Sequence, residues 1–135
     1  MDMSSINWLA VVVCVVAAQV IGFLWYSKPV FLMPWLDSIG KDENFTITAP
    51  PAAYVVNIVA SLVEAVFVSF LISAMGSMGF LAGLTAGFMI WLGFVATTSS
   101  TNASFAQRGL KNWLIESGNH LVTLLVMAAI LAAWR

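Results

Sequence analysis

Residues 52–75 read AAYVVNIVASLVEAVFVSFLISAM, and they are the clearest sign of how this chain folds. Apolar side chains dominate the stretch, and Glu64 is its only charged residue. About 20 apolar residues, rising 1.5 Å each along a helix, cross the ~30 Å hydrocarbon layer of a bilayer. Pro50 and Pro51 fit the first helical turn, where no backbone donor is required. The stretch therefore predicts a transmembrane helix.

The composition of the whole chain supports the same conclusion. Of its 135 residues 61% are hydrophobic and 8% are charged, and the mean hydropathy is +0.98. In soluble domains about a quarter of the residues are charged, and a domain of this size leaves about a third of its surface exposed to water, so a soluble fold could not bury this many apolar residues. The net charge of -1 excludes a basic nucleic-acid-binding protein, and the single cysteine, Cys14, excludes an internal disulfide or a Cys-rich zinc site. Membrane lipid is the expected surrounding, and nucleic acid is not an expected partner.

Three further stretches are long and apolar enough to span a bilayer: residues 6–26, 79–98 and 112–134. Aromatic residues at the ends of the first and last are typical of the belts at membrane interfaces. The residues before the first stretch lack the basic region of a cleavable signal peptide, so this stretch is expected to stay in the membrane. The sequence predicts an all-α, four-helix transmembrane bundle forming one domain over residues 1–135.

The connections between these spans differ in character. Residues 30–36 are apolar but too short to cross a bilayer, which predicts a short interfacial or re-entrant segment after the first helix. Residues 76–79 form a tight turn, and residues 99–111 are expected to form a polar connection. Lysine and arginine are concentrated in the first and third connections, at Lys28, Lys41, Arg108 and Lys111, whereas only Arg135 lies on the other side. This asymmetry predicts that both connections are cytoplasmic and both termini are outside the cytoplasm.

Glycine recurs every four residues at the start of the third span, at Gly79, Gly83 and Gly87. Residues spaced by four lie on one helix face, and glycine allows a neighbouring backbone to approach closely in lipid. The pattern predicts a helix contact. It fits equally an interface between subunits and packing within the bundle.

Polar residues at membrane depth are the best candidates for function. Glu64 lies about 18 Å along the helix that starts at residue 52, near the centre of the hydrocarbon layer, where a carboxylate costs at least ~2.5 kcal/mol. Asn57 and Ser61 lie on the same helix face as Glu64. Further polar residues fall in the same half of the bilayer, namely Glu116, His120 and Thr123 in the fourth span, Gln19 in the first, and Thr97 and Thr98 in the third. We expect a polar cavity that opens on the cytoplasmic side and closes near Glu64.

The sequence leaves several interpretations of this cluster open. Glu64 or Glu116 paired with His120, Arg108 or Lys111 would form a structural network that fixes helix register. A proton or ion relay would use the same carboxyl and imidazole groups near neutral pH. A metal site built from Glu64, Glu116 and His120 is less favoured, because no motif requires it. Enzyme chemistry lacks any hydrolase, metalloprotease, P-loop or dinucleotide motif, and no cofactor is expected.

Several segments resemble a known family. They are NWLA at residues 7–10, GFLWYS at 22–27, WLGFVATT at 91–98, and Gly118 with HLV at 120–122. AAIL at residues 128–131 and the closing Trp134 and Arg135 extend the likeness. Together they resemble the small membrane proteins catalogued as domain of unknown function 1761. The resemblance covers nearly the whole chain and implies a four-span, bacterial-type integral membrane protein, expected in the inner membrane, with an unassigned function.

The favoured hypothesis from the sequence is a homo-oligomeric transporter or channel linked to protons or cations, because a lone bundle of four helices encloses little space. Glu64 and His120 would exchange protons, Glu116 and Arg108 would act at the cytoplasmic mouth, and Asn57, Ser61 and Gln19 would line the cavity. The alternative is a non-catalytic accessory subunit that docks on a larger membrane complex through the Gly79–Gly83–Gly87 face.

Overall fold

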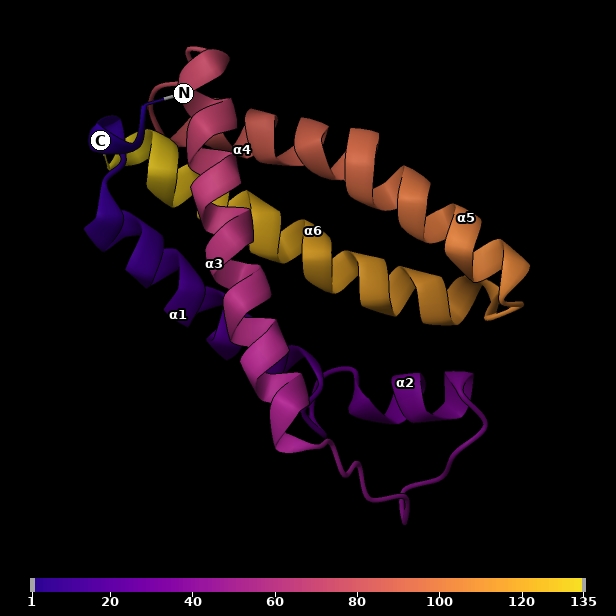
Figure 1. Cartoon of the computed structure of the whole chain (residues 1–135). Helices are drawn as coiled ribbons and strands as arrows, with labels where there is room; N and C mark the ends of the chain where they lie inside the picture. Colours follow the sequence, from indigo (N-terminus) through magenta and orange to yellow (C-terminus); the bar gives the residue numbers. More distant parts are fainter. Residues whose placement is uncertain (1, 135) are drawn as a thin grey trace.

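The computed structural model describes residues 2–134, and within that range it is all helical, with no strand (Figure 1). The long helices are α1 (Trp8–Trp25), α3 (Pro51–Ala74), α6 (Gly109–Ala133) and a continuous rod made of α4 (Phe80–Ile90), the π-helical η2 (Trp91–Ala96) and α5 (Thr97–Phe105). The short helices are η1 (Met3–Ser5) and α2 (Leu32–Ser38). Four of these elements are long and apolar enough to cross a membrane. The predicted fold class is confirmed, and the chain is an integral membrane protein.

Helix α6 is the centre of the molecule, since α1, α2, α3, α4, η2 and α5 all contact it. Two bonds fix the antiparallel register of α1 on α6: Cys14 Sγ lies 3.7 Å from the carbonyl of Met127, and Trp25 Nε1 donates to the carbonyl of Ile115 at 2.9 Å. At the other end Asn7 donates to the carbonyl of Trp134 at 3.1 Å. Both described ends of the chain therefore lie at one end of the bundle, and the α1–α3 connection and the α5–α6 turn lie at the other (Figure 1).

The closest helix contact joins α4 to α6. A Cβ atom built on Gly83 would lie 2.5 Å from the carbonyl oxygen of Ala128, and one on Gly87 would lie 2.7 Å from that of Leu124. The two backbones therefore touch, as small residues allow in lipid. Gly79 precedes this contact with a φ of +91°, and its N–H donates to the carbonyl of Ala132 at 3.0 Å. The glycine face is thus covered by α6 of the same chain.

The third span is longer than the sequence predicts. We expected a polar connection over residues 99–111, but the helix continues to Phe105, so the connection is only residues 106–108. Hydroxyl side chains make this possible because they bond to carbonyls of the preceding turn: Thr101 to Thr97 at 3.1 Å, and Ser104 to Ser100 at 2.8 Å. The fourth span begins at Gly109 rather than at residue 112.

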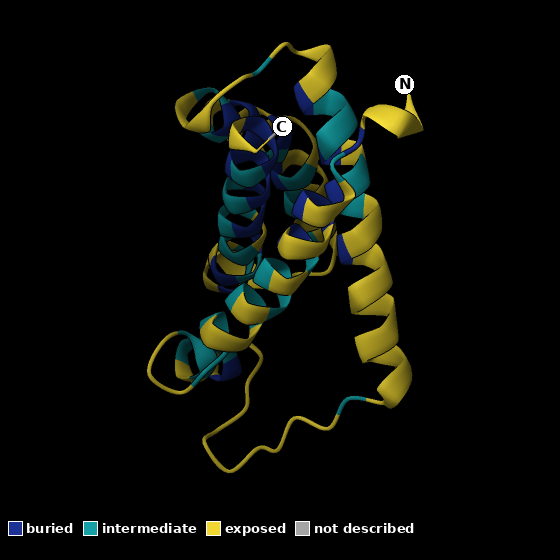
Figure 2. Cartoon of the chain, turned by 90° about the vertical axis from the view of Figure 1, so that its left-hand side faces the viewer, coloured by how far each residue is buried: buried dark blue, intermediate teal, exposed yellow. Residues whose placement is uncertain are grey.

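Helix α3 leaves the bundle over its first half. Every residue from 51 to 60 is exposed, whereas Ser61, Ala65, Val68 and Ile72 are buried along one face of the second half. Figure 2 shows this change along the helix that rises from the long loop, where the lower half is exposed on all sides. Helix α3 therefore packs against the bundle in its second half and diverges from it toward the long loop.

The α4–α6 contact predicts the effect of adding one methyl group. Gly83→Ala should destabilise the bundle by about 2 kcal/mol, because the new Cβ would overlap the backbone of α6 and overpacking of this kind costs 1–3 kcal/mol. Gly22→Ala is the matched control, since no atom lies within 4 Å of a Cβ at that helical position. Unfolding by denaturing detergent would measure both variants. Equal stability of Gly83→Ala and Gly22→Ala would contradict the close contact.

Candidate functional site

The residues predicted to line one cavity fall into two separate groups in the structure. The first lies between α1 and α3 and is named here the α1–α3 ladder: Gln19, Asn57 and Ser61. Asn57 Nδ2 donates to Gln19 Oε1 at 2.7 Å, and Gln19 Nε2 donates to Ser61 Oγ at 3.1 Å. Ser61 Oγ in turn donates to the carbonyl of Asn57 at 2.8 Å. The three side chains form a closed set of hydrogen bonds that ties α1 to α3.

Glu64 lies one turn beyond this ladder, about 20 Å from the start of α3 and close to the middle of that 24-residue helix. Its side chain is half-buried. Within residues 2–134 its carboxyl has no hydrogen bond and no ion pair, although a carboxyl at this depth is costly without a partner. The side chains of the ladder thus have hydrogen-bond partners, whereas the neighbouring carboxyl of Glu64 has none in the described chain.

The second group lies where α2, α5 and the first turns of α6 meet, and it is named here the loop-end site. Its members are Arg108, Asn112, Glu116 and His120 from the α6 side, and Asn102 from α5. Helix α2 has one buried residue, Leu36, and forms one side of the loop-end site, where two hydrogen bonds hold it against α6. Trp35 Nε1 donates to Glu116 Oε1 at 3.2 Å, and Asn112 Nδ2 donates to Ser38 Oγ at 3.2 Å.

An ion pair at the surface also fastens α2 to α6. Lys111 Nζ lies 2.6 Å from Asp37 Oδ2, and the hydrogen bond and positive charge of Lys111 hold the pKa of Asp37 below its ordinary value of 3.8. A carboxyl whose pKa is lowered on folding adds stability above its ordinary pKa, and this is lost as the pH falls through the lowered value. Because both side chains are exposed to solvent, the contribution is small.

Glu116 is the residue on which the loop-end site converges. Besides the indole of Trp35, it accepts a long hydrogen bond of 3.4 Å from Asn112 Nδ2. Its other oxygen, Oε2, lies 3.6 Å from Arg108 Nη1, which is a loose ion pair. The side chain of Arg108 is 55% exposed, and its guanidinium keeps most of its donors for another partner.

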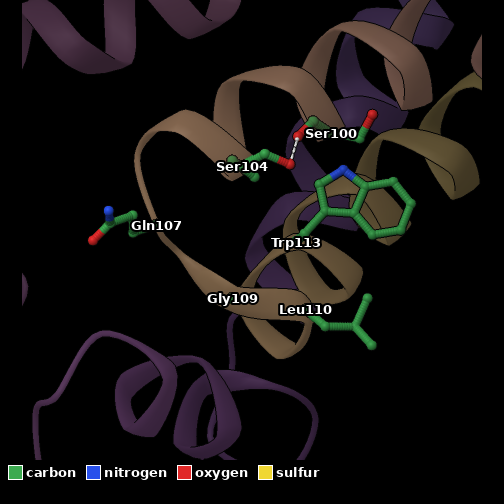
Figure 3. Close-up of a pocket in the computed structure, with 7 residues that line it drawn as sticks. Ser100, Ser104, Gln107, Gly109, Leu110 and Trp113 are labelled. Atoms are coloured by element: carbon green, nitrogen blue, oxygen red, sulfur yellow. Dashed lines mark hydrogen bonds between the residues drawn. The ribbon is translucent and has the colours of Figure 1, made fainter.

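Three hollows surround this convergence. A cavity of about 210 Å³ is bounded by Asn102, Arg108, Glu116 and His120, among others. A second, of about 450 Å³, shares Arg108 and Glu116 and also has Asn112 in its wall. A third is an apolar groove of about 560 Å³, named here the α5–α6 groove, with Leu110 and Trp113 on one side and Ser100 and Ser104 on the other (Figure 3).

Of the remaining predicted residues, His120 lies at the loop-end site, whereas the threonines lie in neither group. His120 borders the smaller cavity one turn beyond Glu116 and makes no hydrogen bond within the part of the chain described. Thr97 and Thr98 are exposed at the start of α5, and Thr97 Oγ1 bonds back to the carbonyl of Gly93 at 2.9 Å. Thr123 does the same to the carbonyl of Asn119. The hydroxyls of Thr97 and Thr123 are therefore satisfied within their own helices.

The metal-site interpretation finds no support in the geometry. Among residues 2–134 no three His, Cys, Asp or Glu side chains lie close enough to hold a metal ion. Glu64, on α3, therefore does not assemble with Glu116 and His120 of α6.

Sequence reasoning missed the role of the tryptophans in the loop-end half. Trp25 and Trp91 donate to the carbonyls of Ile115 and Ser117, each at 2.9 Å, and Trp113 donates to Ser99 Oγ at 3.0 Å. For the aromatic residues at the ends of the first and fourth spans, among them Trp25 and Trp113, the sequence predicts only a place in the interfacial belts. The available signal is that an indole N–H inside an apolar helix needs an acceptor. Two buried acceptors were also missed, since the Oδ1 atoms of Asn112 and Asn119 have no donor in the described chain.

The whole chain was also compared with models of known protein families. A family model described as "Protein of unknown function (DUF1761)" matches residues 9–132. The chain belongs to this family. The resemblance seen in the sequence is thereby confirmed, and it extends across all four spans. Comparison with curated proteins and with solved structures gives no match. The family places the protein among those of unassigned biochemical role.

The α1–α3 ladder predicts an energetic coupling between its members. In a double-mutant cycle, Gln19→Leu and Asn57→Leu should show a coupling free energy of about 1 kcal/mol, in the range found for hydrogen bonds between transmembrane helices. Gln19→Leu combined with Thr85→Val is the control, because Thr85 bonds only to its own helix, at Leu81. Stability in detergent measures each variant. Additive effects of the Gln19 and Asn57 substitutions would contradict the ladder.

Proposed function

We propose that the protein is a homo-oligomeric transporter or channel whose activity is linked to protons or small cations, with Glu64 as the group that exchanges them. The observation that carries the proposal is the lone carboxyl of Glu64 near the middle of α3, directly beyond a polar ladder. Intramembrane carboxyl groups are rare, and they mark ion pathways and proton relays.

The surroundings of Glu64 suit this task. A carboxylate at this depth is costly, so a protonated state or a bound cation offsets the cost of its charge. Asn57, Ser61 and Gln19 supply amide and hydroxyl oxygens, which are suitable ligands for hard cations and suitable partners for water. They lie between Glu64 and the end of α3 that meets the long loop. A proton or cation entering from that end would meet the ladder before the carboxyl.

The exposed half of α3 supports the homo-oligomeric part of the proposal. Residues 51–60 are all exposed, and Asn57, which bonds to Gln19 of α1, lies among them as a polar side chain at membrane depth. A second copy packed against this half would cover the ladder and complete a pathway between subunits. Closed symmetry with two copies is the commonest arrangement of this kind.

The proposal keeps the orientation inferred from the basic residues. Lys28, Lys41, Arg108 and Lys111 lie in or beside the connections at the loop end, which would be cytoplasmic in a bacterial inner membrane. Arg108, Glu116 and His120 would then face the cytoplasmic mouth, and the termini would lie outside the cytoplasm.

The accessory-subunit alternative loses the surface that suggested it. Gly83 and Gly87 are in contact with α6 of the same chain and are not open to a partner. A larger complex would have to use another face, and the uncovered half of α3 is the surface where the two hypotheses compete.

Proton flux into proteoliposomes under a membrane potential tests the role of Glu64. Glu64→Gln keeps the shape of the side chain and removes the exchangeable proton, so flux should fall at least tenfold. Glu43→Gln is the matched control, because Glu43 lies in the polar loop, and flux should be unchanged. His120→Ala asks whether the imidazole belongs to the same path. Equal flux for wild type and Glu64→Gln would overturn the proposal, and repeating the assay with Na⁺ or K⁺ gradients extends it to cations.

Disulfide cross-linking tests the homo-oligomer. Val56→Cys lies on the exposed half of α3, with 66% of its surface uncovered, and oxidation in membranes should give a covalent dimer. Leu81→Cys on α4, 75% uncovered, is the control and should stay monomeric. The native Cys14 is buried and does not compete. Monomers for both variants, together with a constant second protein on purification, would favour the accessory-subunit alternative.

A further inference from the structure

We infer that α3 pairs in parallel with α3 of a second copy of this chain, so that the two Glu64 carboxyls face each other and share one proton. The inference rests on the proposed function and adds to it the partner of Glu64, which is the same residue of the second copy. The side of α3 that forms the pair is named here the polar seam, and its residues are Ala53, Asn57, Ala60, Glu64, Phe67 and Leu71.

The polar seam has the spacing of a coiled coil. Its residues follow one another at alternating intervals of four and three, which keeps them on the side of a helix that faces a second helix winding around it. The first three are exposed, Phe67 is 54% exposed, and Glu64 and Leu71 are half-buried. The face of α3 that is buried within the chain, centred on Ala65 and Val68, lies about a quarter of a turn away around the axis. The seam is therefore open to a second copy.

The two exposed sides of α3 differ in chemistry. On the side away from the polar seam, Val55, Val59 and Leu62 are exposed and apolar, as a surface in contact with lipid should be. The seam instead carries Asn57 and Glu64, whose amide and carboxyl groups are costly against hydrocarbon. A second copy packed on the seam removes this cost, whereas one packed on the apolar side would leave both polar groups in lipid. The polar side is therefore the one that a second copy covers.

The amide of Asn57 has bonding capacity left for a second copy. Ser61 Oγ gives its one proton to the carbonyl of Asn57, so it can only accept from Gln19 Nε2. Gln19 therefore presents Oε1 to Asn57, whose Nδ2 donates to it at 2.7 Å. The Oδ1 atom and the second N–H of Asn57 have no partner in the described chain. Two such amides can bond to each other, and asparagine at a position of this kind fixes the register of two-stranded coiled coils.

The membrane fixes the direction of the pair. Basic residues set one orientation for every copy, so two α3 helices related by a two-fold axis along the membrane normal run parallel. Identical residues then meet at the same depth, and the two Glu64 carboxyls lie on either side of the axis, about 20 Å along α3. Two carboxylates side by side in a site that excludes water do not both stay ionised. The pair therefore holds one proton, bound to one carboxyl and donated to the other.

The helices packed against α3 bring no other charge to this pair. Helices α1 and α6 make the most contacts with α3. The sequence of α1 contains no Asp, Glu, Lys, Arg or His, and the charged or titratable residues of α6, Lys111, Glu116 and His120, lie in its loop-end half. Among residues 2–134 none forms an ion pair with Glu64. The partner's Glu64 is thus the group that can take up its proton, and the transfer crosses the boundary between the subunits.

Cysteine cross-linking at four positions of α3 tests the polar seam. Ala53→Cys and Ala60→Cys lie on the seam, and oxidation in membranes should give covalent dimers of both. Val55→Cys and Leu62→Cys lie on the apolar side and are the matched controls, which should stay monomeric. Val56, the position tested above, borders the seam. Dimers of the controls in the same yield would overturn the seam, and monomers at all four positions would assign this face to lipid or to another protein.

Carbodiimide labelling tests the shared proton. Dicyclohexylcarbodiimide enters the bilayer and adds the O–H of a protonated carboxyl across its C=N bond. One adduct consumes the proton of the pair and fills the space at the axis, so modification of residue 64 should stop at one copy in two. Mass spectrometry of the peptide that contains residue 64 measures the modified fraction. As a control, acidic dissociating detergent should allow modification of every copy.

The outcomes separate this inference from the proposed function. Modification of every copy in membranes would overturn the facing carboxyls, and no modification would overturn the shared proton. Loss of flux in Glu64→Gln together with monomers at Ala53→Cys and Ala60→Cys would leave Glu64 as the exchanging group and reject the α3–α3 pair. Dimers at both positions, with flux unchanged in Glu64→Gln, would keep the pair and reject the proposed function.

Discussion

Inside a bilayer no water is available to bond with a polar group, so each such group must find its partner within the protein. This constraint explains much of the structure. Hydroxyls in α5 bond back to their own helix, indole N–H groups bond to carbonyls of α6, and Gln19 joins Asn57 to Ser61. Against this background the exceptions are informative. Glu64, His120 and the Oδ1 atoms of Asn112 and Asn119 are among the groups that the described chain leaves without partners, and Glu64 carries the proposed function.

The same constraint makes α6 the central helix. Its half near the termini has alanines at 128, 129 and 132, which let the glycines of α4 approach to backbone contact. Its half at the other end instead carries Asn112, Glu116 and Ser117, which bond to α2 and η2. One helix thus supplies a dry, close-packed contact at one end and a polar site at the other. The bundle is held together at the first, and the cavities occur at the second.

Much of this fold could be predicted from the sequence, because the membrane imposes length and apolarity on each span. The observed α1 and α3 begin and end within two residues of the predicted limits. The polar run after Thr97 was misjudged, since hydroxyls that look like a loop in sequence can satisfy their bonds along a helix. The site was harder to predict. Glu64 and Glu116 are each recognisable from the sequence as acidic residues within a membrane span. Whether they lie in one cavity or in two depends on how α3 and α6 pack against the other helices, and the periodicity of a single helix does not contain that information. The exposed half of α3 likewise depends on tertiary packing.

The π-helical segment η2 allows one continuous rod, from α4 to α5, to face both halves of α6. From Gly87 to Ser99 is twelve steps, and at about 100° per residue a regular α-helix would place them about 120° apart around the axis. A π-bulge absorbs one extra residue, which turns everything after it back by about 100° and leaves the two positions about 20° apart. Gly87 touches Leu124 and Ser99 accepts from Trp113, so both do face α6. Without this change of phase, either Gly87 or Ser99 would point away from α6. The close α4–α6 contact and the polar contact between α5 and α6 could then not form on the same rod.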